Sequence, residues 1–234
     1  MQRAADSQPD YAGESVNKAF TRARCADISG WVFTGVTAQM LIFFDRHLAF
    51  LATPKAGSTA IEAALEPLAT TAMLRPAALK HTDLASWRSH VGPWLENQAG
   101  QPFTTVALMR EPVEWLRSWY RFKLRDDHED PEHRMDGVSF AQFARDYAAP
   151  GGPERLNVGR QCDFLTDGAA RADRIFRYDH MEDFVHFLED RLDCAIELPR
   201  LNVPPAVDVS LTDADEADLR RAMAADMALY DSLG

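Results

Sequence analysis

Several features are scarce in this sequence, and each absence excludes a class of protein. The 234 residues include only three cysteines, whose odd number and wide spacing argue against a disulfide framework or a zinc site. The longest apolar run, residues 40–44, is far shorter than the ~20 residues of a membrane-spanning helix. The first residues also lack the apolar stretch of a secretory signal. We therefore expect a cytoplasmic protein with reduced thiols and no transmembrane segment.

Positive charge is scarce as well. Lys and Arg number 25 against 36 Asp and Glu, which gives a formal net charge of −11. An acidic chain is poorly suited to the backbone of a nucleic acid or to an anionic membrane, because both need clustered cations. We therefore expect no nucleic-acid partner, and any anionic ligand must be held by a local group of cations.

From residue 40 onward, short apolar runs alternate with amphipathic segments. The runs at residues 40–44 and 48–52 predict a hairpin, and those at 104–109 and 174–178 predict two more strands. Helices are expected at residues 61–68, 112–123, 140–147, 156–164, 179–192 and 213–233. Residues 70–101 contain Gly92 and Pro93 and are expected to form loops with short helices, the clearest at 82–90.

This alternation predicts an α/β fold in which helices flank a central, mostly parallel β-sheet. Residues 1–38 are expected to form a partly ordered extension. Residues 39–234 show no boundary and are expected to form a single domain.

The strand at residues 48–52 leads directly into a short loop and then a helical pattern. The loop consists of Pro54, Lys55, Ala56, Gly57, Ser58 and Thr59. Backbone N–H groups at a helix N-terminus are unsatisfied and partly positive, and the glycine lets an anion approach them closely. The lysine adds a full charge and the two hydroxyls add donors, so the loop predicts a phosphate site. The alternative is an ordinary strand-to-helix turn, and the order of Lys and Gly differs from the Walker A pattern.

Two motifs together resemble those of a known family. Residues 54–59 resemble the 5′-phosphosulfate loop of sulfotransferases that use 3′-phosphoadenosine 5′-phosphosulfate (PAPS). Residues 106–120 resemble the 3′-phosphate motif of that family, in which a strand ends in Arg, here Arg110, and Ser118 follows eight residues later. Residues 161–165 and 174–179 are also similar to its C-terminal half. The resemblance implies a three-layer fold of P-loop type, similar to that of carbohydrate sulfotransferases.

The resemblance also implies a role for each matching residue. Lys55 would lie at the bridging oxygen, and residues 57–59 at the 5′-phosphate, while Ala56 stands where many members have another small residue. Arg110 and Ser118 would hold the 3′-phosphate, which distinguishes PAPS from ATP. The product would be adenosine 3′,5′-bisphosphate (PAP), and no metal would be needed because Lys55 and the helix N-terminus supply positive charge. Arg177 either reaches the 3′ side of the nucleotide or forms an ordinary ion pair.

The acceptor hydroxyl needs a general base. His81 lies between the two motifs, where carbohydrate 2-O-type members carry theirs; the alternative is a surface histidine at a helix start. His90 and Glu62 are reserve candidates, although a solvent-facing position is the simpler interpretation of Glu62. Trp87 and Trp94 are candidates for stacking on an acceptor ring.

The resemblance implies a small-molecule or saccharide acceptor. Two other functions stay open: a different P-loop phosphotransferase, such as a small-molecule kinase, and a non-catalytic nucleotide-binding protein of the same fold. The acidic segment 125–137 contains His128 and His133, matches no metal-ligand spacing and is expected to be a solvated loop. The sequence does not indicate the oligomeric state.

Overall fold

The computed structural model describes residues 23–24, 40–73, 77–125, 135–151, 153, 156, 158–199 and 206–233. These residues form an α/β fold whose central sheet has the strand order β4-β2-β3-β5-β8. The strands are β2 (Met40–Phe43), β3 (Leu48–Leu51), β4 (Thr71–Met73), β5 (Thr104–Met109) and β8 (Arg174–Arg177). β3, β5 and β8 run parallel, whereas β2 is antiparallel to its neighbours β3 and β4. The predicted hairpin and the two further strands are confirmed.

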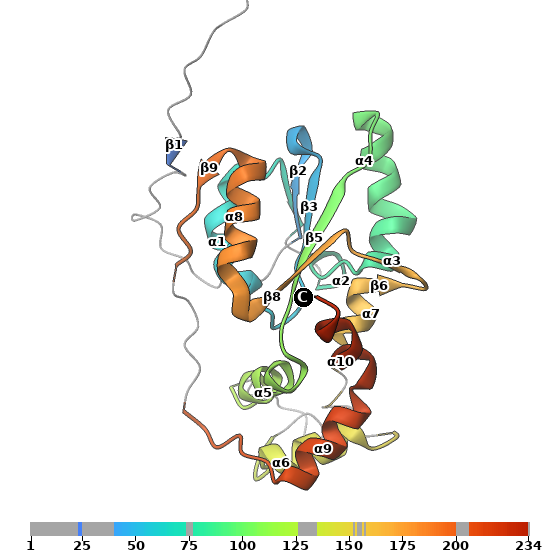
Figure 1. The fold of residues 1–234 in the computed structure, drawn as a ribbon, viewed down its shortest axis with the longest axis vertical. Helices are drawn as coiled ribbons and strands as arrows, with labels where there is room; N and C mark the ends of the chain where they lie inside the picture. The colour runs from blue at the N-terminus through green and yellow to red at the C-terminus, as the bar shows by residue number, and fades with distance from the viewer. Residues whose placement is uncertain are drawn as a thin grey trace, which may run out of the picture.

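Helices cover both faces of this sheet (Figure 1). Because side chains alternate along a strand, Leu48 and Phe50 of β3 point to one face and Ala49 and Leu51 to the other. The first face packs against α1 (Ser58–Leu65) and α8 (Met181–Leu192). The second face packs against α3 (Leu84–Ser86), the π-helical turn η3 (Trp87–Val91), α4 (Gly92–Ala99), α7 (Gln161–Leu165) and α10 (Ala224–Asp231).

A second group of helices lies beyond the carboxyl end of β5. It consists of α5 (Pro112–Lys123), α6 (Phe140–Ala148) and α9 (Asp213–Ala222), which lie at the bottom of Figure 1. Their apolar faces share a separate core that includes Leu116, Phe143 and Leu219. Each helix has a side-chain N-cap, because Glu111, Ser139 and Thr212 each accept a backbone N–H from the first turn.

The remaining described elements are short. β1 (Ala23–Arg24) pairs in parallel with β9 (Cys194–Ala195), and β6 (Thr166–Asp167) forms a hairpin with β7 (Ala170–Arg171). The other elements are α2 (Ala77–Lys80), η1 (Phe44–Arg46), η2 (Glu66–Leu68) and η6 (Tyr178–His180). Among the described residues, no helix has the length and apolar character needed to cross a bilayer.

The helix expected at residues 82–90 is longer than predicted. α3, η3 and α4 follow one another without a break, so the helical path reaches Ala99. Gly92 does not end the helix; it is needed for packing. A Cβ at this position would lie 2.9 Å from Nε1 of Trp87, so only glycine lets the helix backbone pass that ring. Pro93 follows the wide π-turn at the start of α4, where its missing N–H removes no regular α-helical bond.

The last predicted helix is divided in two. The sequence pattern predicts one helix over residues 213–233, but α9 ends at Ala222 and α10 begins at Ala224. Met223 between them has φ −98° and ψ 22° and is fully buried. The break lets α9 pack against α5 and α6 while α10 turns onto the sheet. The helix expected at residues 156–164 is also replaced, by the short α7.

Candidate functional site

The loop at residues 53–57 joins the carboxyl end of β3 to α1. Two of its residues have left-handed backbone conformations, Lys55 with φ 63° and Gly57 with φ 78°. The side chain of Ala56 is buried in the core between the sheet and α1, which explains why a small residue stands there. The Pro54 carbonyl accepts a hydrogen bond from Nε1 of Trp115 at 2.8 Å, so α5 helps to hold the loop in place.

Position 57 requires a glycine for two reasons: its backbone has a positive φ, and a neighbouring aromatic ring leaves no room for a Cβ. A Cβ at this position would lie 2.3 Å from Cε2 of Tyr178, which immediately follows β8. The guanidinium of Arg110, just after β5, lies 5.0 Å from the centroid of the same ring. Tyr178 therefore joins the ends of three parallel strands and brings the two predicted phosphate motifs to one edge of the sheet.

Lys55 lies over aromatic rings of α5. Its Nζ is 4.1 Å from the ring centroid of Phe122 and 5.7 Å from that of Trp119, distances at which a cation is attracted to a ring face. Burial, together with the positive charges of Arg125 and Arg110, lowers the pKa of Lys55 to about 8. The lysine thus lies in a group of cations, and an anion placed there would relieve their mutual repulsion.

Arg110 is held mainly through its backbone. Its N–H donates to Oε1 of Gln161 at 2.9 Å, and its carbonyl accepts from Nε2 of the same side chain at 2.8 Å. The guanidinium lies 3.7 Å from a carboxylate oxygen of Glu114, one turn into α5. Burial lowers the pKa of Arg110, and Tyr178 and Glu114 oppose that shift. Gln161 begins the segment 161–165 whose resemblance was noted, but the sequence assigned it no role at the site.

The predicted hydroxyl donors lie on two helices that border the loop. Ser58, the first residue of α1, is buried, and Thr59 is half-buried. Ser118 is half-buried on α5, at the helical spacing that places it on the same side as Trp115 and Phe122. Because those two rings contact the loop, Ser118 belongs to the face of α5 that faces the site.

His81 lies beside the same loop. Its Nδ1 is 2.9 Å from the carbonyl oxygen of Ala52, the residue that follows β3. A carbonyl can only accept a hydrogen bond, so Nδ1 carries the proton and Nε2 keeps its lone pair. Burial lowers the pKa of His81, the bond to Ala52 opposes this, and the charge of Lys80 adds to it. His81 is therefore neutral at pH 7, which is the state that a general base requires.

Glu62 is not the solvent-facing helix residue that the sequence favoured. It is fully buried on α1, four positions after the first residue of that helix. Burial lowers the pKa of Lys80, and the negative charge of Glu62 opposes that shift, so the two side chains lie within electrostatic reach. His81 contacts the carboxyl end of β3 through Ala52, and Glu62 lies within electrostatic reach of Lys80, the neighbour of His81, whereas His90 is exposed on η3.

Arg177 makes contacts on the opposite face of the sheet from Tyr178. Its Nη2 donates to the Tyr230 carbonyl at 3.2 Å, and its guanidinium lies 4.6 Å from the centroid of that ring. The Tyr230 hydroxyl in turn donates to Asp179 at 2.6 Å. Successive side chains of a strand point to opposite faces. Arg177 therefore contacts Tyr230 of α10 on one face, while Tyr178 contacts Gly57 on the other.

The two candidate stacking residues differ in position. Trp87 is buried in the core beneath α4, so the prediction that it stacks on an acceptor is wrong. Trp94, on α4, is 62% exposed. Phe122 is 39% exposed and contacts Lys55, so it is an aromatic residue of the site that the sequence did not indicate. His128 and His133 lie outside the described residues.

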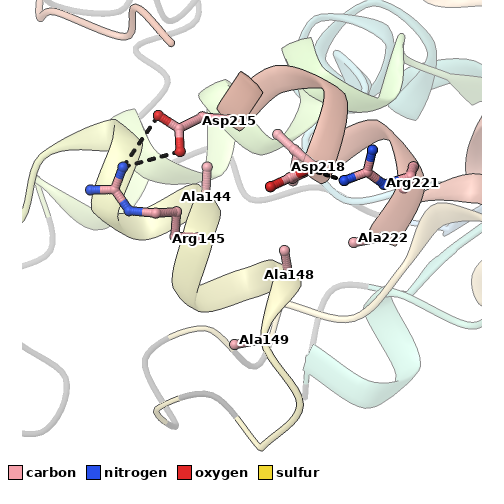
Figure 2. A pocket seen from close by; sticks show the side chains of 9 residues that line it. Ala144, Arg145, Ala148, Ala149, Asp215, Asp218, Arg221 and Ala222 are labelled. Carbon is pink, nitrogen blue, oxygen red and sulfur yellow. Dashed lines mark hydrogen bonds and ion pairs between the residues drawn. The ribbon is translucent and has the colours of Figure 1, made fainter. Parts of the chain in front are cut away.

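A pocket of about 480 Å³ lies elsewhere, between α6 and α9 (Figure 2). Its floor is made of small side chains, including Ala144, Ala148 and Ala222. The charges around it are paired, because Arg145 binds Asp215 at 3.1 Å and Arg221 contacts Asp218. None of the predicted site residues lines this pocket, and its paired charges leave no evident attraction for an ion. We therefore take the edge of the sheet at Lys55 as the candidate site.

No protein-family model matches the chain, and no curated protein matches its sequence. Within the part of the chain that the structure describes, no group of three or more His, Cys, Asp or Glu side chains has a geometry suited to a metal ion. The chemistry of the site therefore has to be argued from its own residues.

Proposed function

We propose that this protein is a PAPS-dependent sulfotransferase that transfers the sulfuryl group to a hydroxyl of a saccharide or other small molecule. One observation carries the proposal: the ring of Tyr178 lies against Gly57 of the Lys55 loop and against the guanidinium of Arg110, although the loop and Arg110 follow different strands. The contacts of Lys55 with Phe122 and of Arg110 with Tyr178 leave both cations at one edge of the sheet. Paired cations beside a helix N-terminus suit a ligand with two phosphate groups.

The residues present fit such a nucleotide. The α1 N-terminus, Lys55 and the hydroxyls of Ser58 and Thr59 would hold the 5′-phosphosulfate, and Arg110 with Ser118 would hold the 3′-phosphate. The Thr53 hydroxyl, buried at the start of the loop, has no hydrogen-bond partner among the described residues and is a further donor available there. PAPS supplies the sulfuryl group. Lys55 would neutralise the negative charge that develops on the leaving phosphate oxygen.

His81 is the general base in this proposal. The Ala52 carbonyl fixes its Nδ1–H tautomer, so Nε2 is available to take the proton of the acceptor hydroxyl. Its lowered pKa keeps the ring neutral at pH 7. Glu62 is the alternative base, since it is buried on α1 within electrostatic reach of Lys80, the neighbour of His81.

Calorimetric titration with PAP tests the proposal. We expect the wild-type protein to bind PAP without magnesium, and Arg110→Ala to weaken binding by at least about tenfold because a charge-assisted contact is lost. Arg145→Ala, which removes an arginine from a surface ion pair on α6, is the matched control and should bind normally. Failure of the wild type to bind PAP, or an Arg110→Ala variant that binds equally well, would contradict the proposal.

Two further measurements separate the alternatives. Magnesium-dependent binding of ATP in preference to PAP would indicate a kinase. Tight PAP binding with no transfer of labelled sulfate from PAPS to any of a panel of saccharide and phenolic acceptors would indicate a non-catalytic nucleotide-binding protein.

A further inference from the structure

The side chain of Gln161 completes the hydrogen bonding of a strand. The ladder between β5 and β8 ends at the pair Met109 and Arg177. Arg110 is the next residue of the chain, and the single amide of Gln161 satisfies both its N–H and its carbonyl, at 2.9 and 2.8 Å. An amide group has one acceptor oxygen and a donor nitrogen, so it reproduces the two bonds that a neighbouring strand would otherwise make.

This contact is built into the interior. Gln161 is 1% exposed and is the first residue of α7, on the side of the sheet that α10 covers. The next residue, Cys162, donates its backbone N–H to Oδ1 of Asp226 at 2.9 Å, and Asp226 is fully buried on α10. The start of α7, which carries Gln161, is therefore held by α10 and not by the loop that carries Lys55.

The backbone of Arg110 determines where its guanidinium can reach. Arg110 stands between the last residue of β5 and Glu111, which caps α5, and Pro112 then begins that helix. If the peptide groups on either side of Arg110 rotate, the side chain swings away from the Tyr178 ring that it now faces at 5.0 Å. A bidentate contact with a phosphate tolerates little such movement.

We propose that Gln161 is a positioning residue, which fixes the backbone of Arg110 and so selects nucleotides that carry a 3′-phosphate. This inference rests on the proposed function, in which Arg110 contacts that group. Gln161 itself does not touch the nucleotide. Its removal should therefore weaken the recognition of one phosphate group and leave the loop at Lys55 intact.

The test compares PAP with adenosine 5′-monophosphate, which lacks the 3′-phosphate. In Gln161→Met, which has a similar volume and no amide, we expect PAP affinity to fall about tenfold, while affinity for the monophosphate changes less than about twofold. A general loss of structure would weaken both ligands together. Gln161→Asn, whose shorter side chain withdraws the amide, replaces the Met variant if that one does not fold. Gln98→Met, the same change on the exposed side of α4, is the control.

A second readout does not need the nucleotide at all. Hydrogen exchange at the Arg110 backbone N–H should become faster in Gln161→Met, because its buried partner is gone. Unchanged exchange at that N–H, or a folded variant that keeps the wild-type preference for PAP, would overturn the role of Gln161 while leaving the proposed function in place. A wild-type protein that binds the two nucleotides equally would overturn the proposed function and, with it, this inference.

Discussion

The ring of Tyr178 lies so close to Gly57 that a Cβ on the glycine would come within 2.3 Å of a ring carbon. This contact joins the end of β8 to the loop after β3, although the two residues are far apart in the sequence. Because Arg110 also packs against the Tyr178 ring, the same side chain determines the distance between the two cationic parts of the site.

Gly57→Ala should therefore be more harmful than other substitutions of glycines with positive φ. We expect a loss of about 2–4 kcal/mol in the free energy of unfolding, from the left-handed backbone and from displacement of the ring. Gly100→Ala is the matched control, because Gly100 also has a positive φ, 71°, but a methyl group added there would have no atom within 4 Å. It should lose only about 1 kcal/mol. Equal losses in thermal or urea unfolding would show that the ring contact is unimportant.

The pKa of Lys55, lowered to about 8, makes anion binding depend on pH. Since the charged lysine attracts phosphate, PAP affinity should decrease as pH rises above 8, by up to about tenfold per pH unit. Near pH 8.5, binding should take up protons, which calorimetry in buffers of different ionisation enthalpy measures directly. Lys55→Arg remains charged and should remove most of this dependence. A proton uptake of zero in the wild type would contradict the assignment.

Lowering of the same pKa also affects stability. The unfolded lysine has an ordinary pKa of 10.5, so between about pH 8 and 10.5 the unfolded chain binds more protons than the folded one. The contribution of Lys55 to the free energy of unfolding should therefore rise with pH across this window. The difference between wild type and Lys55→Met in urea unfolding at pH 7 and pH 10 measures that contribution. A difference that does not change with pH would show that the lysine is not buried as described.

His81→Asn separates the two candidate bases. The asparagine amide can still donate to the Ala52 carbonyl, but it cannot accept a proton from the acceptor. We expect kcat to fall by about 10²–10⁴-fold with little change in PAP affinity. Glu62→Gln should retain most of its activity. The opposite pattern, with Glu62→Gln inactive and His81→Asn active, would assign the base to Glu62.

The acidic limb of the pH profile gives an independent check on the base. Because burial lowers the pKa of His81 below the usual 6.5, the rate should begin to fall only below that pH. An acidic limb well above pH 6.5 would contradict a neutral, buried histidine as the base.

Two tryptophans on consecutive helical segments, η3 and α4, should respond very differently to removal. Trp87→Ala empties a core position and should cost about 3–5 kcal/mol in the free energy of unfolding. Trp94→Ala, at a position 62% exposed, should change it by less than about 0.5 kcal/mol. Chemical denaturation measures both values, and similar values for the two variants would contradict their positions in the structure.

The sequence predicted the parts of the fold that depend on local patterns. The apolar runs of β2, β3 and β5 are fully or nearly buried, and continuous apolar runs are typical of such strands. The loop residues and Arg110 also fall at strand ends, as expected. Their approach to one another follows from parallel strands, whose carboxyl ends lie at the same edge of the sheet.

Other features depend on contacts between distant residues and leave no local signal. The bonds between Gln161 and Arg110 span 51 positions, and an isolated glutamine has no pattern that predicts its partner. The polarity of Glu62 pointed to solvent, but α1 lies against the sheet and buries it. Gly92 and Pro93 predicted a break in the helix, because the sequence does not reveal that the Trp87 ring packs against position 92 and requires a glycine there.

The hydrogen bond between Asp226 and the start of α7 has a consequence for synthesis of the protein. Helix α10 supplies the carboxylate that holds α7, and α7 supplies the amide that holds Arg110. While α10 is still inside the ribosome, α7 lacks its hydrogen bond to Asp226, and the contact of Gln161 with Arg110 is not yet supported. The loop at Lys55 and its helix emerge much earlier, so this edge of the sheet is completed only after α10 has left the ribosome.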